Sequence, residues 1–395
     1  MSMRKYISLC LIITLQSLSL LSFSQTISIV NKTFVVNGDS KSPIYFNGAN
    51  VPWESWNDFG GNYDSLKWKQ DFEDLNANGI NSARIWFSCN GEGQPSLDID
   101  GTVHNPSDRF WKDCDNVFAH AKKNGVYIMA TLMSFDHTKP NNKNYQNWQA
   151  MINDTAKIRT YLNNYLIPFV NRYKTNPYFW SIDICNEIEW IAENGDKTNS
   201  DKNWGCSYDV LQRFVSMCCV AMHSKEIARK DNSRVLVTLG SATVKWNGTY
   251  KKSASFSTET VPFPDGNKWS DKALQSAYKN KAAYLDFYSP HFYAWVNEWF
   301  SSPFEKSPAD YGISDKACVV GEMPSRNPFP LPQGTATPLQ MLQLTAYENM
   351  LRLGWQGHFP WTANIDFNLT NEVGTIKDFG EATKEFKKAH PTLVK

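Results

Sequence analysis

The chain has 395 residues, and its 40 lysines and arginines nearly cancel its 39 aspartates and glutamates, leaving a formal net charge of +1. This balance argues against a polyanionic partner such as nucleic acid and favours an uncharged substrate. The length fits either two average domains or one large α/β barrel with elaborated loops. With 15 tryptophans and 17 tyrosines the chain is rich in rings that stack on sugars as well as fill cores.

Residues 1–24 have the layout of a secretory signal peptide. Arg4 and Lys5 precede an apolar run, and the small residues Ser22 and Ser24 precede Gln25. Polar residues at positions 16, 17 and 19 interrupt the run, which argues against a permanent membrane anchor. We therefore expect residues 1–24 to be removed, residues 25–395 to form a single domain, and the protein to be secreted, periplasmic or at the cell surface.

The cysteines suggest neither a metal site nor a complete disulfide framework. Of the eight cysteines, Cys10 belongs to the leader, and the odd number that remains leaves at least one unpaired. None of the spacings matches a zinc site, and the adjacent Cys218 and Cys219 lie in a helical pattern. One or two disulfides stay possible in an exported chain, without an assigned pairing. We expect no metal and no organic cofactor.

Strand-like and helical segments alternate along the rest of the chain. Residues 27–38 predict a short β-hairpin with Asn37 and Gly38 as turn residues. Eight apolar segments then predict strands, at 44–51, 81–87, 126–133, 179–187, 234–241, 285–293, 318–324 and 355–363. Eight successive units, without a glycine-rich phosphate-binding turn after the first strand, favour a (β/α)8 TIM barrel over a doubly wound sheet.

The helices and loops between these strands support the barrel. Apolar residues recur at intervals of three and four in five helical segments, at 65–79, 109–125, 158–174, 211–230 and 338–354. Connections from helix to strand are short, whereas three connections from strand to helix are long, at 88–107, 188–207 and 241–269. This asymmetry is expected when the rim at the carboxyl ends of the strands carries the working site.

Two glutamates end strands of this predicted barrel. Glu187 closes the fourth strand in SIDICNEIEW, and Glu322 closes the seventh in ACVVGEMP. Hydrolysis of a glycosidic bond with retention needs a carboxylic acid and a carboxylate about 5 to 5.5 Å apart. A closed barrel directs both strand ends at one central cleft, so the two residues are candidates for the acid/base and the nucleophile.

With a glutamate at the end of strand four and another at the end of strand seven, the sequence resembles glycoside hydrolase family 5. This family belongs to the clan of barrels whose acid/base and nucleophile lie on those two strands. The resemblance covers residues 25–395 and implies one catalytic domain. It rests on motifs in order along the chain: YFNGANVPW, Arg84 in SARIWF, Asn186-Glu187, His291 and Tyr293 in SPHFY, Glu322 in VVGEMP, and Trp361 in FPWTA.

The resemblance implies a role for each matching residue. Asn186 would bind the sugar 2-hydroxyl beside the nucleophile. Tyr293 would donate its phenolic proton to Glu322, and the positive charge of Arg84 would lower the pKa of that carboxyl. The charge of an ionised Glu322 would help to keep Glu187 protonated until attack on the sugar neutralises it.

Further candidates for substrate contact are aromatic residues and histidines. Trp361 is the candidate platform beneath the sugar at the cleavage point, and His291 is expected to touch the acid/base or a hydroxyl. Many family members carry a histidine at the end of strand three, where this chain reads LMSFDH, and the sequence leaves open whether His137 fills that role. About half of the tryptophans at or beyond the strand ends are expected to contact substrate. These rim tryptophans are Trp53, Trp86, Trp190, Trp204, Trp246, Trp295 and Trp299.

The sequence thus predicts an exported, monomeric endo-β-glycosidase that cleaves a β-1,4-linked polysaccharide or oligosaccharide, with mannan ranked ahead of glucan. An exo-acting β-glycosidase or a transglycosylase on the same barrel stays open, because the long loops after strands four and five can close one end of a cleft. A non-catalytic carbohydrate-binding barrel is a further alternative, although such a protein needs no pair of carboxylates accompanied by Asn186 and Tyr293.

Overall fold

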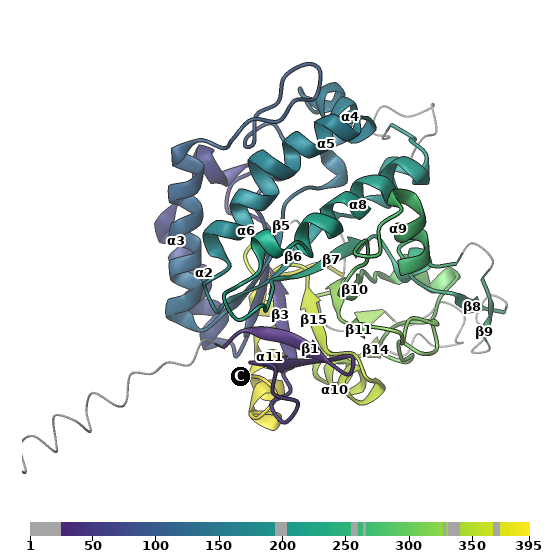
Figure 1. Ribbon diagram of the computed structural model, residues 1–395. Helices are drawn as coiled ribbons and strands as arrows, with labels where there is room; N and C mark the ends of the chain where they lie inside the picture. The colour runs from purple at the N-terminus through teal and green to yellow at the C-terminus, as the bar shows by residue number, and fades with distance from the viewer. Residues whose placement is uncertain are drawn as a thin grey trace, which may run out of the picture.

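The centre of the computed structural model is a parallel β-sheet closed into a barrel (Figure 1). The structure describes residues 25–193, 204–253, 260–263, 266–326, 329–330, 340–365 and 372–395. The predicted leader, residues 1–24, lies outside these described residues. The strands of the barrel are β3 Phe46–Asn50, β4 Ser82–Trp86, β5 Tyr127–Thr131, β6 Phe179–Asn186, β7 Leu236–Ser241, β10 Phe287–Pro290, β11 Ala317–Cys318, β12 Val320–Met323 and β15 Gly357–Pro360.

The barrel closes through the two parts of one strand. In the sheet order β11-β10-β7-β6-β5-β4-β3-β15-β12, the first and last members are halves of the predicted seventh strand, separated only by Val319. Val319 donates its backbone N–H to Tyr288 at 3.0 Å, and a parallel bridge joins His291 to Glu322. The predicted (β/α)8 TIM barrel is therefore confirmed, and each of the eight predicted strands takes its expected place.

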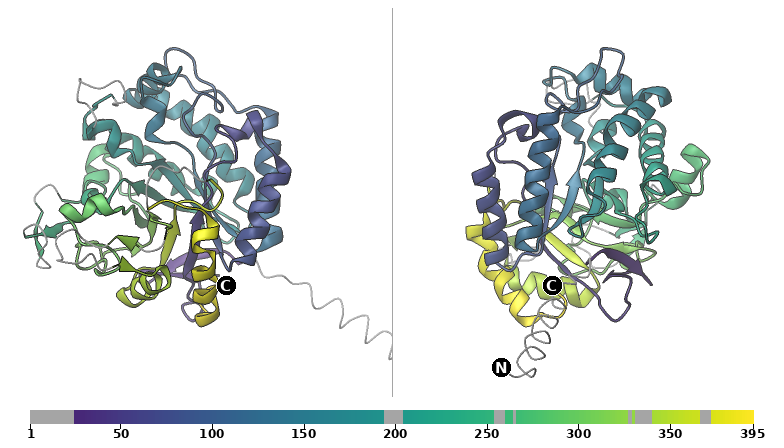
Figure 2. Two further views of the ribbon diagram at one scale, coloured as in Figure 1. Left: turned by 180° about the vertical axis from the view of Figure 1, so that it is seen from behind. Right: turned by 60° about the vertical axis from the view of Figure 1, so that its left-hand side comes forward.

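Helices surround the barrel, as two further views show (Figure 2). They are α2 Ser65–Ala77, α3 Asp108–Asn124, α4 Tyr145–Asn153, α5 Thr155–Tyr161, α6 Ile167–Tyr173, α7 Glu189–Glu193, α8 Tyr208–Met222, α9 Asp271–Tyr278, α10 Gln343–Leu353 and α11 Ile376–Ala389. Side chains cap several of them, as where Asp64 accepts from the first backbone N–H groups of α2. Helix α8 ends at Met222, earlier than the predicted 230, because the polar segment that follows offers few apolar residues to the barrel.

The predicted hairpin is present, but its turn lies elsewhere. Strands β1 Ile27–Val30 and β2 Thr33–Val36 pair antiparallel, and Asn31 and Lys32 make the turn with φ of 50° and 62°. Asn37 and Gly38, the predicted turn residues, instead follow β2. Two consecutive residues with positive φ match the twist of a two-residue hairpin, which is why the reversal occurs at Asn31 and Lys32.

The hairpin packs against the amino-terminal end of the barrel. Phe34 lies with its ring centroid 5.2 Å from Phe46, 5.5 Å from Trp180 and 5.1 Å from Phe287. These rings belong to a buried cluster of barrel-interior residues that is separate from the large core between sheet and helices. Because this end is filled by apolar side chains, a ligand reaches the barrel from the opposite, carboxyl-terminal end.

The seven cysteines from Cys89 to Cys318 are all free thiols, and six of them are buried. Among the described residues, none of the helices combines the length and apolar character that crossing a bilayer requires.

Candidate active site

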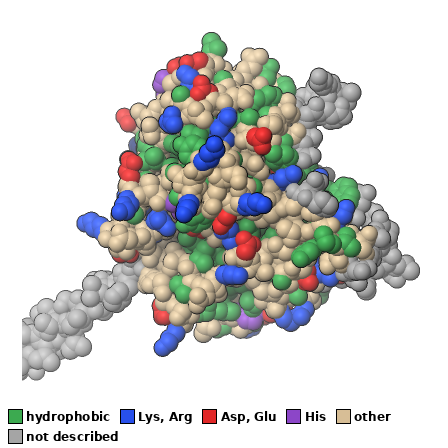
Figure 3. Space-filling view, turned by 45° about the vertical axis from the view of Figure 1, so that its right-hand side comes forward, with side chains coloured by type: hydrophobic (Ala, Val, Ile, Leu, Met, Phe, Trp, Pro, Cys, Tyr) green, Lys and Arg blue, Asp and Glu red, His purple; other side chains and the backbone are tan. Residues whose placement is uncertain are grey.

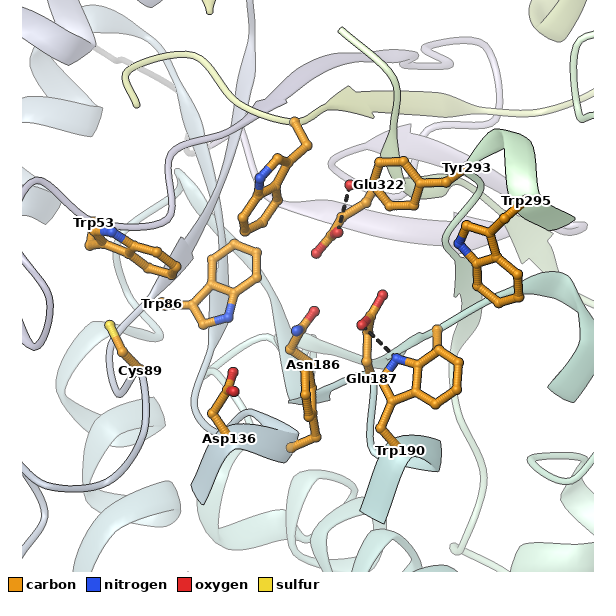
Figure 4. A pocket seen from close by; sticks show the side chains of 13 residues that line it. Trp53, Trp86, Cys89, Asp136, Asn186, Glu187, Trp190, Tyr293, Trp295 and Glu322 are labelled. Carbon is orange, nitrogen blue, oxygen red and sulfur yellow. Dashed lines mark hydrogen bonds between the residues drawn. The ribbon is translucent and has the colours of Figure 1, made fainter. Parts of the chain in front are cut away.

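A cavity of about 520 Å³ opens at the carboxyl ends of the barrel strands (Figure 4). This volume suits a few sugar rings rather than a single small ion. The space-filling view shows acidic and basic side chains mixed over one face of the molecule, in keeping with the net charge of +1 (Figure 3). The cavity is lined by Trp53, Trp86, Cys89, Phe135, Asp136, Asn186, Glu187, Trp190, Ala242, Tyr293, Trp295, Glu322 and Trp361.

Glu187 follows β6 directly and enters the cavity from its end. Its backbone adopts the left-handed conformation with φ of 49°, which is uncommon for a residue with a side chain, and its N–H donates to Gly240 at 2.7 Å. The indole of Trp190 donates to Oε2 at 2.8 Å, and His291 Nδ1 lies 2.9 Å from Oε1. The carboxyl group is thus held between two rings and only 16% of the side chain is exposed.

Burial raises the pKa of Glu187 to about 7. The hydrogen bond from Trp190 and the charge of Arg84 act in the opposite direction, while the negative charge of Asp136 adds to the increase. Since a general acid near neutral pH needs a pKa near 7, this environment suits proton donation. Burial is therefore the largest cause of the raised pKa of Glu187. From the sequence, the charge of Glu322 was expected to be the cause.

Glu322 lies on β12, across the cavity from Glu187, and has a different set of partners. Arg84 Nη1 donates to Oε1 at 2.7 Å, and the Tyr293 hydroxyl donates to Oε2 at 3.0 Å. Burial raises the pKa of Glu322, and the neighbouring His291 and Arg84 oppose that increase. The expected lowering by Arg84 is thus present, but burial outweighs it. A carboxyl group that receives a cationic donor and a phenolic donor is the one of the pair that ionises first.

The two carboxylates lie close enough to act on one bond. Oxygen atoms of Glu187 and Glu322 and a ring nitrogen of His291 lie within 4.8 Å of one another. Burial lowers the pKa of His291 to about 4, so its ring is neutral at pH 7.

The ligand atoms of Glu187, His291 and Glu322 are also close enough together for a metal ion. Because Glu322 already bonds a buried guanidinium, the arrangement suits proton transfer and nucleophilic attack better than cation binding.

Arg84, on β4, connects most of the polar groups beneath the cavity. Besides Glu322 it donates to Asp183 at 2.7 and 2.9 Å, to Asn186 at 2.8 Å and to Asn50 at 3.1 Å, and it is fully buried. The bond to the Asn186 oxygen leaves the amide NH₂ of that residue available as a donor, and Asn186 lines the cavity (Figure 4). Asp183 and Asn50 were not anticipated, although both lie on predicted strands.

Gly240, on β7, provides the space for this network. A Cβ atom at this position would lie 2.6 Å from Arg84 Nη2, 2.8 Å from Asp183 Oδ2 and 3.0 Å from His291 Nε2. Such distances are too short for a side chain, so glycine is required by close packing rather than by its own backbone angles.

Tryptophans flank the two carboxylates on both sides (Figure 4). The rings of Trp86 and Trp361 are 5.1 Å apart, and Trp53 lies 6.2 Å from Trp361. On the other side, Trp190 lies 6.0 Å from Trp295. Four of the seven rim tryptophans singled out in the sequence therefore line the cavity, together with Trp361. The remaining three do not: Trp204, Trp246 and Trp299.

His137 does not line the cavity. It is fully buried, its Nε2 lies 2.9 Å from the Ser88 hydroxyl, and burial lowers its pKa to about 3. The neighbouring Phe135 and Asp136 face the cavity instead. Neither residue was singled out from the sequence, although their position directly after the third strand is a signal that could have identified them.

The chain is similar to named mannanases over most of its length. It is 26% identical over 341 residues to a mannan endo-1,4-beta-mannosidase of Cryptopygus antarcticus, with 81% of each chain covered. It is 26% identical over 360 residues to one of Mytilus edulis, with 86% of this chain and 89% of the relative covered. These relatives confirm that the chain resembles mannan-hydrolysing glycoside hydrolases, as predicted from its sequence. No protein-family model matches the chain.

Solved structures confirm the fold. The endo-1,4-beta-mannanase of Eisenia fetida superposes with a TM-score of 0.72 at 21% identity, covering 92% of this chain and 95% of its own. The beta-mannanase of the blue mussel Mytilus edulis also gives 0.72, at 22% identity, covering 94% and 99%.

Proposed function

We propose that the protein is a retaining endo-β-1,4-mannanase in which Glu187 is the acid/base and Glu322 the nucleophile. The observation that carries this proposal is a pair of carboxyl groups in an aromatic cavity, with oxygen atoms within 4.8 Å of each other and with different partners. Closely spaced carboxyl groups are typical of retaining enzymes, since inverting enzymes keep theirs farther apart to admit water.

In the first half-reaction the Glu322 carboxylate attacks the anomeric carbon and forms an ester bond to the sugar. The glycosidic C–O bond breaks, and Glu187 gives its proton to the departing oxygen. Arg84 and Tyr293 keep Glu322 ionised and hold both of its oxygens, so that the carboxylate meets the anomeric carbon in a fixed orientation. The Asn186 amide binds the 2-hydroxyl, a contact that strengthens in the transition state.

In the second half-reaction water replaces the leaving group. Glu187, now ionised, takes a proton from the water molecule while the water oxygen attacks the anomeric carbon and releases the Glu322 carboxylate. Trp190 supports the ionised form of Glu187 by donating to Oε2 at 2.8 Å. The same residue therefore serves as acid and then as base, with its pKa placed near 7 by burial.

Mannan is the favoured substrate because both curated relatives are named for endo-hydrolysis of mannan. Tryptophans on both sides of the carboxylates fit a chain that extends through the site in two directions, which supports endo-action. The small net charge fits an uncharged polysaccharide. The leader predicted at residues 1–24 supports export of the protein, and we propose that the protein acts as a monomer.

Covalent labelling tests the catalytic roles. An aryl 2-deoxy-2-fluoro-β-mannobioside with a good leaving group should trap the glycosyl-enzyme, and peptide mapping should place the label on Glu322. Glu322→Gln should remain unlabelled, while Glu348→Gln, which changes a surface carboxyl bonded to His390, should label like the wild type. A label on another carboxyl group, or products of inverted configuration, would contradict the assignment.

Product sizing tests the substrate and the mode of action. Internal cleavage of β-1,4-mannan should give a broad range of oligosaccharides early in the reaction, with slower release from β-1,4-glucan. Stepwise release of one small product would indicate the exo-acting alternative, and longer products than the substrate would indicate transglycosylation. Binding of mannan without any cleavage would indicate a non-catalytic barrel.

A further inference from the structure

An ionisable side chain that the mechanism above does not use lies in the cavity. Asp136 belongs to a short 3₁₀ helix, Phe135–Thr138, that begins four residues after β5 ends at Thr131. Its carboxyl group lines the cavity beside Asn186 and Trp86 and points inward (Figure 4). A carboxyl group in a site for an uncharged substrate has a desolvation cost on substrate binding, unless the substrate bonds to it.

The surrounding residues hold this carboxyl group in one orientation. The Ser134 hydroxyl donates to Oδ2 at 2.9 Å, and Lys139 Nζ lies 2.9 Å from Oδ1. Lys139 is itself placed over the Phe135 ring, 4.3 Å from its centroid. Each carboxylate oxygen can accept more than one hydrogen bond, and 26% of the side chain stays exposed. The group is thus a fixed acceptor with free capacity on the cavity side.

The position beside Asn186 indicates which sugar it faces. In the proposed mechanism Asn186 binds the 2-hydroxyl of the sugar attacked by Glu322, so a group next to Asn186 faces the same ring. The hydroxyl adjacent to the 2-hydroxyl on that ring, away from the anomeric carbon, is the 3-hydroxyl. The 4-hydroxyl carries the next sugar of the polymer and has no proton to donate.

We propose that Asp136 is a substrate-binding residue whose carboxylate accepts a hydrogen bond from the 3-hydroxyl of the sugar at the cleavage point. This inference rests on the proposed function of the same site. A hydrogen bond to a charged group contributes enough that its loss should lower kcat/KM roughly ten- to a hundredfold. A substrate without this hydroxyl leaves the carboxylate desolvated and unpaired, so the site also selects for it.

A second consequence concerns the pH profile, because Asp136 also acts on Glu187 through space. Its negative charge raises the pKa of Glu187, whereas the positive charge of Lys139 lowers it. Activity falls as pH rises through the pKa of the acid, so Asp136→Asn should move the alkaline limb of kcat/KM to lower pH. Lys139→Gln should move it to higher pH. The other charged or titratable groups facing Glu187 are common to all variants: Arg84, His291, Tyr293 and Glu322.

A double-mutant cycle between protein and substrate tests the proposal. Its two substrates are an aryl β-mannobioside and the analogue whose reducing-side ring lacks the 3-hydroxyl. For the wild type the missing hydroxyl should cost ten- to a hundredfold in kcat/KM, and for Asp136→Ala, which has no side-chain acceptor, it should cost less than threefold. A 6-deoxy analogue serves as the substrate control. The protein control is Asp100→Asn, since Asp100 bonds the Thr102 hydroxyl and Lys157 in a similar trio outside the cavity.

The outcomes separate this inference from the proposed function. Asp100→Asn should match the wild type on every substrate and at every pH. Equal losses on removing the 3-hydroxyl in wild type and Asp136→Ala would overturn the role of Asp136 as an acceptor, and an unmoved alkaline limb in Asp136→Asn would overturn its effect on Glu187. If the wild type cleaves no β-mannoside at all, the proposed function itself fails, whatever the variants do.

Discussion

Replacing Arg84 with methionine should destabilise the protein strongly, because a fully buried cation serves two buried carboxyl groups. Arg84 bonds Asp183 and Glu322, whose side chains are 0% and 6% exposed. Removing one partner of a buried ion pair typically costs about 3–5 kcal/mol, since the charge left behind is unpaired. Asp183 keeps bonds from Thr131 and from the Gly240 N–H, which places the expected loss toward the lower part of that range.

A loss of this size is measurable, since it is a large part of the roughly 5–15 kcal/mol that stabilises an ordinary protein. Urea unfolding followed by tryptophan fluorescence should show a lower midpoint with an unchanged slope. The double variant Arg84→Met with Asp183→Asn should recover about half of the loss, because it removes the unpaired charge.

The matched control is Arg172→Met. Arg172 pairs with Asp115 at the surface, where the two side chains are 44% and 45% exposed. Exposed pairs contribute about 0–1 kcal/mol, so this variant should unfold nearly as the wild type does. A loss in Arg84→Met no larger than that of the control, or a double variant less stable than the single one, would refute the reasoning.

Three further substitutions probe the site. Tyr293→Phe removes a donor to Glu322 and should lower kcat roughly tenfold or more, with the acid limb of the pH profile moved to higher pH; an unchanged profile would speak against the role. Trp361→Ala should reduce turnover with a modest change in Tm, whereas a loss of ~3–5 kcal/mol with full activity per folded molecule would indicate a core residue. Gly240→Ala should cost about 1–3 kcal/mol by displacing Arg84, and an unaltered Tm in calorimetry would disprove that.

Predictions from the sequence were correct for elements that are defined by patterns within a few neighbouring residues. Alternating strand and helix patterns predicted each of the barrel strands, because apolar periodicity reports which face of an element is buried. The hairpin at residues 27–38 was also predicted, but the position of its turn was wrong. Asn37-Gly38 does form a turn with positive φ, but that turn follows the second strand, and Asn31-Lys32 joins the two strands.

The region after the third strand shows the limit of such reasoning. His137 and Asp136 are adjacent in the chain, and the sequence offered the histidine as the candidate for the site. In the structure the histidine bonds Ser88 inside the protein, and the aspartate faces the cavity. In a short 3₁₀ helix successive side chains point about a third of a turn apart, so the orientation of the helix decides which residue meets the substrate.

Local patterns in the sequence were enough to predict the barrel and to place Glu187 and Glu322 at its carboxyl-terminal rim, because strand ends can be located from patterns within a few residues. The difference between the two carboxyl groups depends on contacts that form only in the folded protein. Arg84 and Tyr293 bond Glu322, Trp190 and His291 bond Glu187, and burial raises the pKa of both. These partners come from strands and loops far apart in the chain, so their distances depend on closure of the whole barrel, which no local pattern contains.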